Sequence, residues 1–190
     1  KTSLSTLKAA LEMKAKQGYS KVTVALIAGS GLGAVAAECA KYGADEVVTV
    51  ESGELGTYLA PSFASALVEL VEKTGASAVV GVSSARGKDL FPRVAQALDA
   101  GQASDILEVL PDNQFKRPMY AGNLIATVKL NSAKKVITVR PTAFDPASAT
   151  GNAAPIRAES VSISSDGKTE FISYDSVKSE RPELGEAEIV

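Results

Sequence analysis

A glycine-rich turn is the first feature of this sequence that could do chemistry. The turn, Gly29-Ser-Gly31-Leu-Gly-Ala34, follows an apolar run and precedes a helical pattern, which matches the G-x-G-x-x-A fingerprint of dinucleotide-binding domains. Glycines there let the backbone approach a pyrophosphate, and a helix N-terminus attracts the anion. Glu51 ends the next predicted strand, where an acid would bind ribose hydroxyls. One hypothesis is therefore an NAD(P)-binding domain of an oxidoreductase.

A second polar loop, residues 83–89, also joins a predicted buried strand to a helix. The side chains of Ser84, Arg86 and Lys88, together with free backbone amides, could receive a phosphate. This makes an AMP- or ATP-binding module another hypothesis. The alternative is a polar turn whose charged groups cap the helix or contact a partner. The residue types alone leave these interpretations open.

Histidine is absent, and Cys39 is the only cysteine. The composition therefore excludes Ser-His-Asp and Cys-His catalysis and makes a zinc site untenable. Cys39 lies in an alanine-rich helical stretch, so we expect a buried structural thiol. We predict no metal site.

The charge and hydropathy of the chain bear on its partners. The formal net charge is -2 and no basic tract follows a phosphate backbone, which argues against nucleic-acid binding. No apolar run approaches the length of about 20 residues that a membrane-spanning helix needs. We expect neither a nucleic-acid partner nor a membrane protein.

The elements that must position the two loops alternate in type along the first half of the chain. Hydrophobic periodicity predicts helices over residues 4–17, 34–42, 61–74 and 90–98, and strands over residues 22–28, 46–50 and 78–82. The run at 22–28 is almost continuously apolar, as in a strand covered on both faces. Short connections between strands and helices predict right-handed crossovers and a mostly parallel, doubly wound sheet.

The pattern changes after about residue 104. Strand-like segments at 106–110, 115–120, 124–130 and 135–139 are separated by short turns, and we predict added antiparallel strands there. Residues 141–157 read as an exposed loop. Segments 159–164 and 170–174 flank Asp166-Gly167, a dipeptide that favours a hairpin turn.

Several segments resemble one known family. The run from Gly81 to Ala95, GVSSARGKDLFPRVA, closely resembles the alpha subunit of electron transfer flavoproteins. Further similar segments follow in the same order and cover nearly the whole chain: Ser3–Ala10, Ile27–Gly29, Ser104–Ile106, Tyr120–Asn123, Val139–Asp145 and Ser179–Leu184.

The resemblance implies a three-layer α/β domain of the adenine nucleotide alpha hydrolase-like kind. Residues 1–158 would form this N-terminal domain, and residues 159–190 a hairpin-like extension and linker. The family's FAD-binding domain would follow Val190, so the chain reads as a fragment that lacks it. The family's first strand, expected before Lys1, is also missing from the sequence. Because that strand is usually central, its loss would leave a gap between neighbouring strands.

The resemblance also implies a function for the intact protein. Electron transfer flavoproteins are heterodimers that carry electrons from acyl-CoA and related dehydrogenases to a membrane-bound quinone oxidoreductase, as in fatty acid β-oxidation. FAD is bound by the second domain and AMP by the beta subunit. We therefore expect no catalytic residue and no cofactor in this chain, which would pack on the beta subunit as a scaffold. The compartment would be the mitochondrial matrix in a eukaryote and the cytoplasm in a bacterium.

The resemblance changes how the second loop is interpreted. The related beta subunit binds AMP with the corresponding region, but the alpha version differs in sequence. Residues 83–89 would then be a former phosphate loop or an interface loop, with Arg86, Lys88 and Arg93 as its cations.

Overall fold

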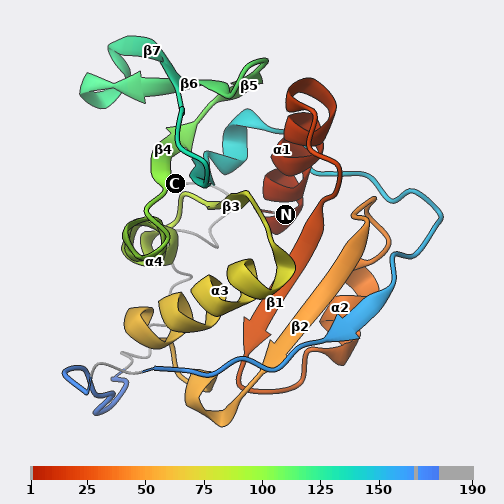
Figure 1. Ribbon diagram of the computed structural model, residues 1–190, viewed down its shortest axis with the longest axis vertical. Helices are drawn as coiled ribbons and strands as arrows, with labels where there is room; N and C mark the ends of the chain where they lie inside the picture. The colour runs from red at the N-terminus through yellow and green to blue at the C-terminus, as the bar shows by residue number, and fades with distance from the viewer. Residues whose placement is uncertain (1, 165–166, 176–190) are drawn as a thin grey trace, which may run out of the picture.

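Helices and strands alternate along the first half of the chain, as predicted (Figure 1). The computed structural model describes residues 2–164 and 167–175. The first-half elements are α1 (Thr2–Gln17), β1 (Thr23–Ala28), α2 (Gly33–Cys39), β2 (Glu46–Glu51), the 3-10 turn η1 (Gly53–Leu55), α3 (Ala60–Thr74), β3 (Ala78–Val82) and α4 (Ala85–Ala97).

The second half consists mainly of strands. Its elements are β4 (Gly101–Ile106), β5 (Glu108–Leu110), β6 (Gln114–Met119), η2 (Tyr120–Gly122), β7 (Leu124–Lys129), β8 (Lys135–Val139), η3 (Pro141–Ala143) and β9 (Ile156–Ala158). The described strands form two parallel sheets, β1-β2-β9 and β3-β8-β4, and one antiparallel sheet, β5-β6-β7. The predicted α/β class, with parallel sheets and added antiparallel strands, is confirmed.

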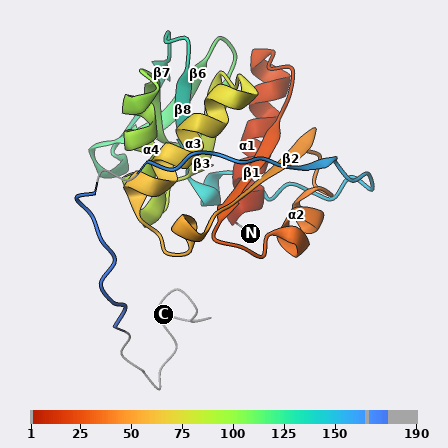
Figure 2. The same cartoon turned by 60° about the horizontal axis from the view of Figure 1, so that its bottom comes forward.

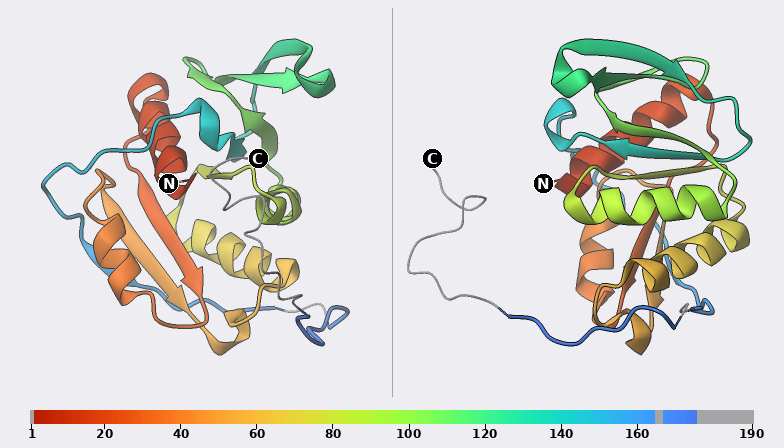
Figure 3. Two further views of the ribbon diagram at one scale, coloured as in Figure 1. Left: turned by 180° about the vertical axis from the view of Figure 1, so that it is seen from behind. Right: turned by 90° about the vertical axis from the view of Figure 1, so that its left-hand side faces the viewer.

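Strand β8 lies at the centre of the second parallel sheet and is covered on both faces. Ile137 and Val139 pack in a cluster with Ala9 and Met13 of α1. Val136, on the opposite face, packs with residues of α3 and α4. Because all three β8 side chains are fully buried, this strand holds the helices on the two faces together (Figure 3).

Strand β2 has a similar position in the first parallel sheet. Val47 packs with Ala36 of α2, whereas Val48 and Val50 pack with Ala66 and Leu70 of α3. The alternation follows the period of two in a strand. Together the two parallel sheets lie between α1 and α2 on one side and α3 and α4 on the other, which is the predicted three-layer arrangement.

The prediction that residues 135–139 form an added antiparallel strand is wrong. These residues form β8, which pairs in parallel with both β3 and β4. Their apolar run is typical of a strand buried on both faces of a parallel sheet. The prediction also missed β4, whose sequence GQASDI is too polar to show a strand pattern. It is a strand because it pairs with β8.

Neither segment of the predicted hairpin, 159–164 or 170–174, forms a strand in the described part of the chain, and the turn residue Asp166 lies outside the described residues. Instead, β9 pairs in parallel with β2, and residues 159–164 run extended along α3 (Figure 2). The Ser162 and Ser164 amides donate to Glu69 Oε2 at 2.8 Å and Ser65 Oγ at 2.9 Å. We call residues 159–164 the strap.

The predicted gap has a counterpart in the sheets. In the described part of the chain, no strand pairs with the second edge of β1 or of β3, so the parallel strands fall into two sheets. This also explains why β1, predicted to be buried on both faces, is only half-buried and has an exposed Ala25. None of the described helices is long and apolar enough to cross a membrane.

Candidate functional site

The glycine-rich turn and Glu51 do meet, at the carboxyl ends of β1 and β2. Gly31 has φ +81°, a left-handed conformation that favours glycine. A Cβ on Gly29 would lie 2.7 Å from the Gly56 Cα, so that glycine is required where the chain after η1 crosses the turn. The backbone N–H of Leu32 donates to Glu51 Oε1 at 2.6 Å.

This geometry gives the turn a structural role. The Glu51 carboxylate accepts a hydrogen bond from the Leu32 amide at the start of α2, so this amide is already paired. The negative charge of Glu51 would also repel a pyrophosphate. Helix α2 has only seven residues, so its dipole attracts an anion weakly. Gly29 accommodates the chain's own backbone rather than a ligand. The arrangement therefore argues against the NAD(P) hypothesis, for which Gly29, Gly31 and Glu51 were the candidate residues.

Most of the predicted loop 83–89 belongs to a helix in the structure. Helix α4 begins at Ala85, whereas the sequence predicted a helix from residue 90. Ser84 is the N-cap, and its Oγ accepts a hydrogen bond from the Gly87 amide at 3.1 Å. A Cβ on Gly87 would lie 2.0 Å from the Val82 carbonyl oxygen, so the helix start is pressed against the strand. The Ser84 hydroxyl predicted to receive a phosphate caps the helix instead.

Two cations near this loop, Arg86 and Arg93, interact with neighbouring side chains at the surface beside Tyr58. The Arg86 guanidinium lies 5.3 Å from the centre of the Tyr58 ring, and Arg93 Nε donates to Asp89 Oδ1 at 3.4 Å. The Tyr58 hydroxyl donates to Asp89 Oδ2 at 3.2 Å. Burial raises the pKa of Tyr58, and the nearby Asp89 charge raises it further. Lys88 is also exposed. The structure thus places these cations at the surface, where a partner could reach them.

One polar pair at the carboxyl ends of β4 and β8 was not predicted as a site. Asp105 lies in an irregular part of β4 with φ +58°, and Arg140 follows β8. The Asp105 amide donates to Thr138 Oγ1 at 2.8 Å. Arg140 Nε donates to Asp105 Oδ2 at 3.2 Å, and Arg140 Nη2 makes a second bond to the same oxygen.

The ion pair affects the pKa of the Asp105 carboxyl. Burial raises the pKa of this carboxyl, but the hydrogen bond and charge of Arg140, together with smaller contributions from Ser83 and Lys88, outweigh burial, so the pKa lies below its ordinary value. Asp105 and Arg140 are 35 positions apart, and no local pattern pairs them. The sequence contains only an indirect sign of this pair, because Asp105 and Arg140 both lie in segments that resemble the family.

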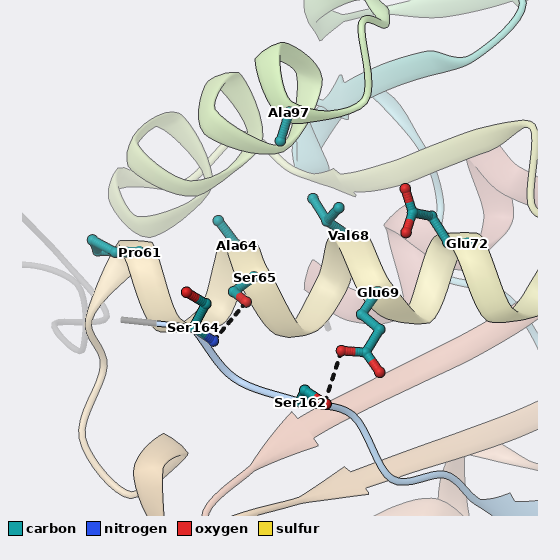
Figure 4. Close-up of a pocket in the computed structure, with 9 residues that line it drawn as sticks. All are labelled: Pro61, Ala64, Ser65, Val68, Glu69, Glu72, Ala97, Ser162 and Ser164. Carbon is teal, nitrogen blue, oxygen red and sulfur yellow. Dashed lines mark hydrogen bonds between the residues drawn. The ribbon is translucent and has the colours of Figure 1, made fainter. Parts of the chain in front are cut away.

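A groove of about 660 Å³ lies between α3, α4 and the strap (Figure 4). Its apolar wall includes Pro61, Ala64 and Val68, and its charged residues are Glu69 and Glu72. Glu69 holds the strap through the Ser162 amide. A groove whose charged side chains are both acidic is unsuited to a phosphate.

Metal and thiol chemistry find no support in the described residues. Among them, no group of three or more His, Cys, Asp or Glu side chains could hold a metal ion. Burial raises the pKa of the Cys39 thiol, and the Glu38 charge raises it further. A raised thiol pKa disfavours the reactive thiolate, which favours a structural cysteine, although Cys39 is half-buried rather than buried as predicted.

Comparison with known proteins adds independent information. The family model for the electron transfer flavoprotein domain matches residues 1–164. An electron transfer flavoprotein subunit alpha from Pseudomonas aeruginosa is 42% identical over 167 residues, covering 87% of this chain and 53% of the relative. The Paracoccus denitrificans subunit alpha is 36% identical over 183 residues, covering 96% of this chain and 57% of the relative.

A eukaryotic relative is also similar. A Caenorhabditis elegans protein named probable electron transfer flavoprotein subunit alpha, mitochondrial, is 34% identical over 166 residues, covering 87% of this chain and 50% of the relative. The chain therefore spans about half the length of the curated relatives it matches.

The turn geometry predicts the outcome of a nucleotide titration. We expect the melting temperature to stay unchanged in 10 mM NADH, AMP or ATP, since even a Kd of about 1 mM would stabilise the fold by about 1.4 kcal/mol. Glu51→Ala should lower stability by about 1 kcal/mol through loss of the hydrogen bond to the turn. Glu54→Ala, on η1, is the matched control and should change little. A shift with NADH that disappears in Glu51→Ala would revive the NAD(P) hypothesis.

The Asp105–Arg140 pair predicts a dependence of stability on acid. A carboxyl whose pKa is lowered by folding stabilises the protein above its ordinary pKa of about 3.9, and this contribution is lost as the pH falls through the lower folded value. Asp105→Asn should therefore be less stable than the parent at pH 7, with a difference that shrinks below about pH 4. Urea denaturation at several pH values measures it. Asp112→Asn in the β5–β6 turn is the control, and an equal deficit of Asp105→Asn at all pH values would contradict the account.

Proposed function

Since the chain belongs to the electron transfer flavoprotein family, as an N-terminal domain of the alpha subunit, we propose that it is a scaffold domain of a two-subunit electron carrier. The scaffold role is supported by the polar interactions at the carboxyl ends of the parallel strands, which is where α/β proteins usually bind ligands. The Glu51 carboxylate, the Ser84 hydroxyl and the Asp105–Arg140 pair provide polar partners at these ends from within the chain.

The redox chemistry of the intact protein would lie outside this chain. We propose that FAD is bound by a following domain and AMP by the beta subunit. The assembled heterodimer would pass electrons from acyl-CoA and related dehydrogenases to a quinone oxidoreductase, as in fatty acid β-oxidation. The relatives from Caenorhabditis elegans and Dictyostelium discoideum carry "mitochondrial" in their names, which supports the mitochondrial matrix for a eukaryotic source. A bacterial source implies the cytoplasm.

The predicted domain boundary supports a simple arrangement of the polypeptide. Residues 1–158 would form the domain, and residues 159–190 would lead to the flavin-binding domain. The strap anchors the start of this extension, since the Glu159 amide donates to the Thr49 carbonyl at 2.9 Å and the Ser164 amide to Ser65. The surface cations Arg86, Lys88 and Arg93 are candidates for contact with the beta subunit.

The two open strand edges suggest how the parallel sheets are joined in the intact protein. We propose that one further strand, from outside the described residues, pairs in parallel with β1 and β3. The apolar, half-buried side chains of Leu26 and Ile27 favour such a neighbour, because unpaired apolar edges are otherwise prone to aggregation.

Hydrogen exchange tests this strand. The Ile27 and Val80 amides point to the open edges of β1 and β3, because the neighbouring Ala28 carbonyl and Ser83 amide already bond within the two sheets. Both amides should exchange at least about tenfold more slowly in the complete alpha subunit than in this chain, because a paired edge opens less often. The β6 amide of Phe115, in the interior of its own sheet, serves as the control and should exchange alike in both. Equal exchange of Ile27 and Val80 in the two forms would contradict the proposed strand.

The scaffold role predicts the behaviour of the purified chain. We expect it to be colourless and to take up no FAD, and to co-purify with the beta subunit of the same source when the two are co-expressed. Absorbance near 450 nm and size-exclusion chromatography check both outcomes. A stoichiometric yellow colour, or no association with the beta subunit, would contradict the proposal.

A further inference from the structure

The tip of the β6–β7 hairpin projects beyond the core (Figure 1). Further back along the hairpin, Phe115 is fully buried and Val128 packs against the same core cluster. Because strand side chains alternate, Arg117 and Met119 lie on the same face as Phe115. Met119 pairs with Leu124 in the ladder, so the core-facing side of this sheet continues past the core as a face that no described element covers.

A polar pocket of about 560 Å³ lies where this tip meets the carboxyl ends of β4 and β8. Its charged residues are Asp105, Arg117 and Arg140. Asp105 and Arg140 pair with each other, whereas Arg117 makes no ion pair among the described residues, and its Nε is buried without a hydrogen-bond partner. The pocket therefore has one positive charge in excess and a buried donor without an acceptor.

The rim of the pocket is apolar. Tyr120 is 77% exposed, Leu124 50% and Met119 38%. Tyrosine, methionine and arginine are the side chains enriched at protein interfaces. Tyr120 and Ala121, neither of them glycine, have φ values of +50° and +56°, and such strained backbone is concentrated at functional positions.

These observations together select the occupant. The uncompensated guanidinium calls for a carboxylate or phosphate. Only a macromolecule would also cover the apolar side chains around it, and contiguous exposed apolar residues with a polar neighbour mark protein-binding surfaces. A carboxylate on a protein surface satisfies both requirements, whereas a free anion satisfies only the first.

We propose that the hairpin tip is a protein-docking surface, in which an Asp or Glu side chain of the beta subunit enters the pocket and pairs with Arg117 while Tyr120 and Met119 pack on apolar side chains around it. The choice of the beta subunit rests on the proposed function. The surface is distinct from the Arg86 and Arg93 cluster beside Tyr58. Asp105 keeps Arg140 in place at the back of the pocket, so that the entering carboxylate meets two guanidinium groups.

The test measures the affinity of the alpha polypeptide encoded by the complete reading frame for the beta subunit of the same source. Arg117→Gln should weaken binding at least about 30-fold, because it removes one partner of a buried charge pair. Arg117→Lys, which keeps the charge but not the planar fork, should fall between Arg117→Gln and the parent. Lys116→Gln is the matched control, since Lys116 lies on the opposite face of β6 and pairs with Glu108, and its affinity should match the parent.

Tyr120→Ser is a second variant for the case that Arg117→Gln fails to fold. The Tyr120 side chain is exposed at the tip and therefore contributes little to stability. This variant should weaken binding about tenfold with an unchanged melting temperature. Parental affinity in both Arg117→Gln and Tyr120→Ser would overturn the docking surface while leaving the proposed function intact. Absence of binding by the parent would overturn both. Stabilisation of the parent by 20 mM phosphate or acetate, lost in Arg117→Gln with subunit affinity unchanged, would reassign the pocket to a small anion and overturn the docking surface.

Discussion

The insertion of β8 between β3 and β4 is the constraint on which the rest of the domain depends. The chain leaves the sheet after β4, makes the β5-β6-β7 hairpins, and returns to place Val136, Ile137 and Val139 in two core clusters. The same strand supplies Thr138, whose hydroxyl accepts a hydrogen bond from the Asp105 amide, and Arg140, the partner of Asp105, directly follows it. One parallel strand thus joins the helices on both faces and fixes the polar groups at the carboxyl edge.

The carboxyl edge of the parallel strands is the feature on which the proposed scaffold role rests. Backbone amides and charged groups at the strand ends must find partners once they leave water. Here the partners belong to the chain: Glu51 accepts from Leu32, Ser84 caps α4, and Asp105 holds Arg140. Among the described residues, the buried side-chain atoms without a hydrogen-bond partner include Arg117 Nε at the hairpin tip and Ser83 Oγ next to β3. Of these two, only Arg117 carries a charge, and exposed apolar side chains surround it.

The fold class followed from the sequence because alternation and turn residues are local signals. The errors came from signals that are not local. The polar segment of β4 is a strand only because β8 pairs with it, and the Asp105–Arg140 contact joins residues 35 positions apart. The turn at Gly29 matched a ligand fingerprint, but a glycine is required there because Gly56 approaches it. The same glycine pattern suits either a bound pyrophosphate or a close approach of the protein's own backbone. Only the tertiary structure distinguishes these two roles.

The central claim, that this domain works by packing on protein rather than by binding a cofactor, can be tested directly by hydrogen–deuterium exchange with each candidate added in turn. The account predicts that the beta subunit slows exchange of the amides in residues 117–126, and that FAD or NADH changes no segment. Slower exchange of residues 29–34 or 83–89 on adding either cofactor, with no change at the hairpin on adding the beta subunit, would contradict it.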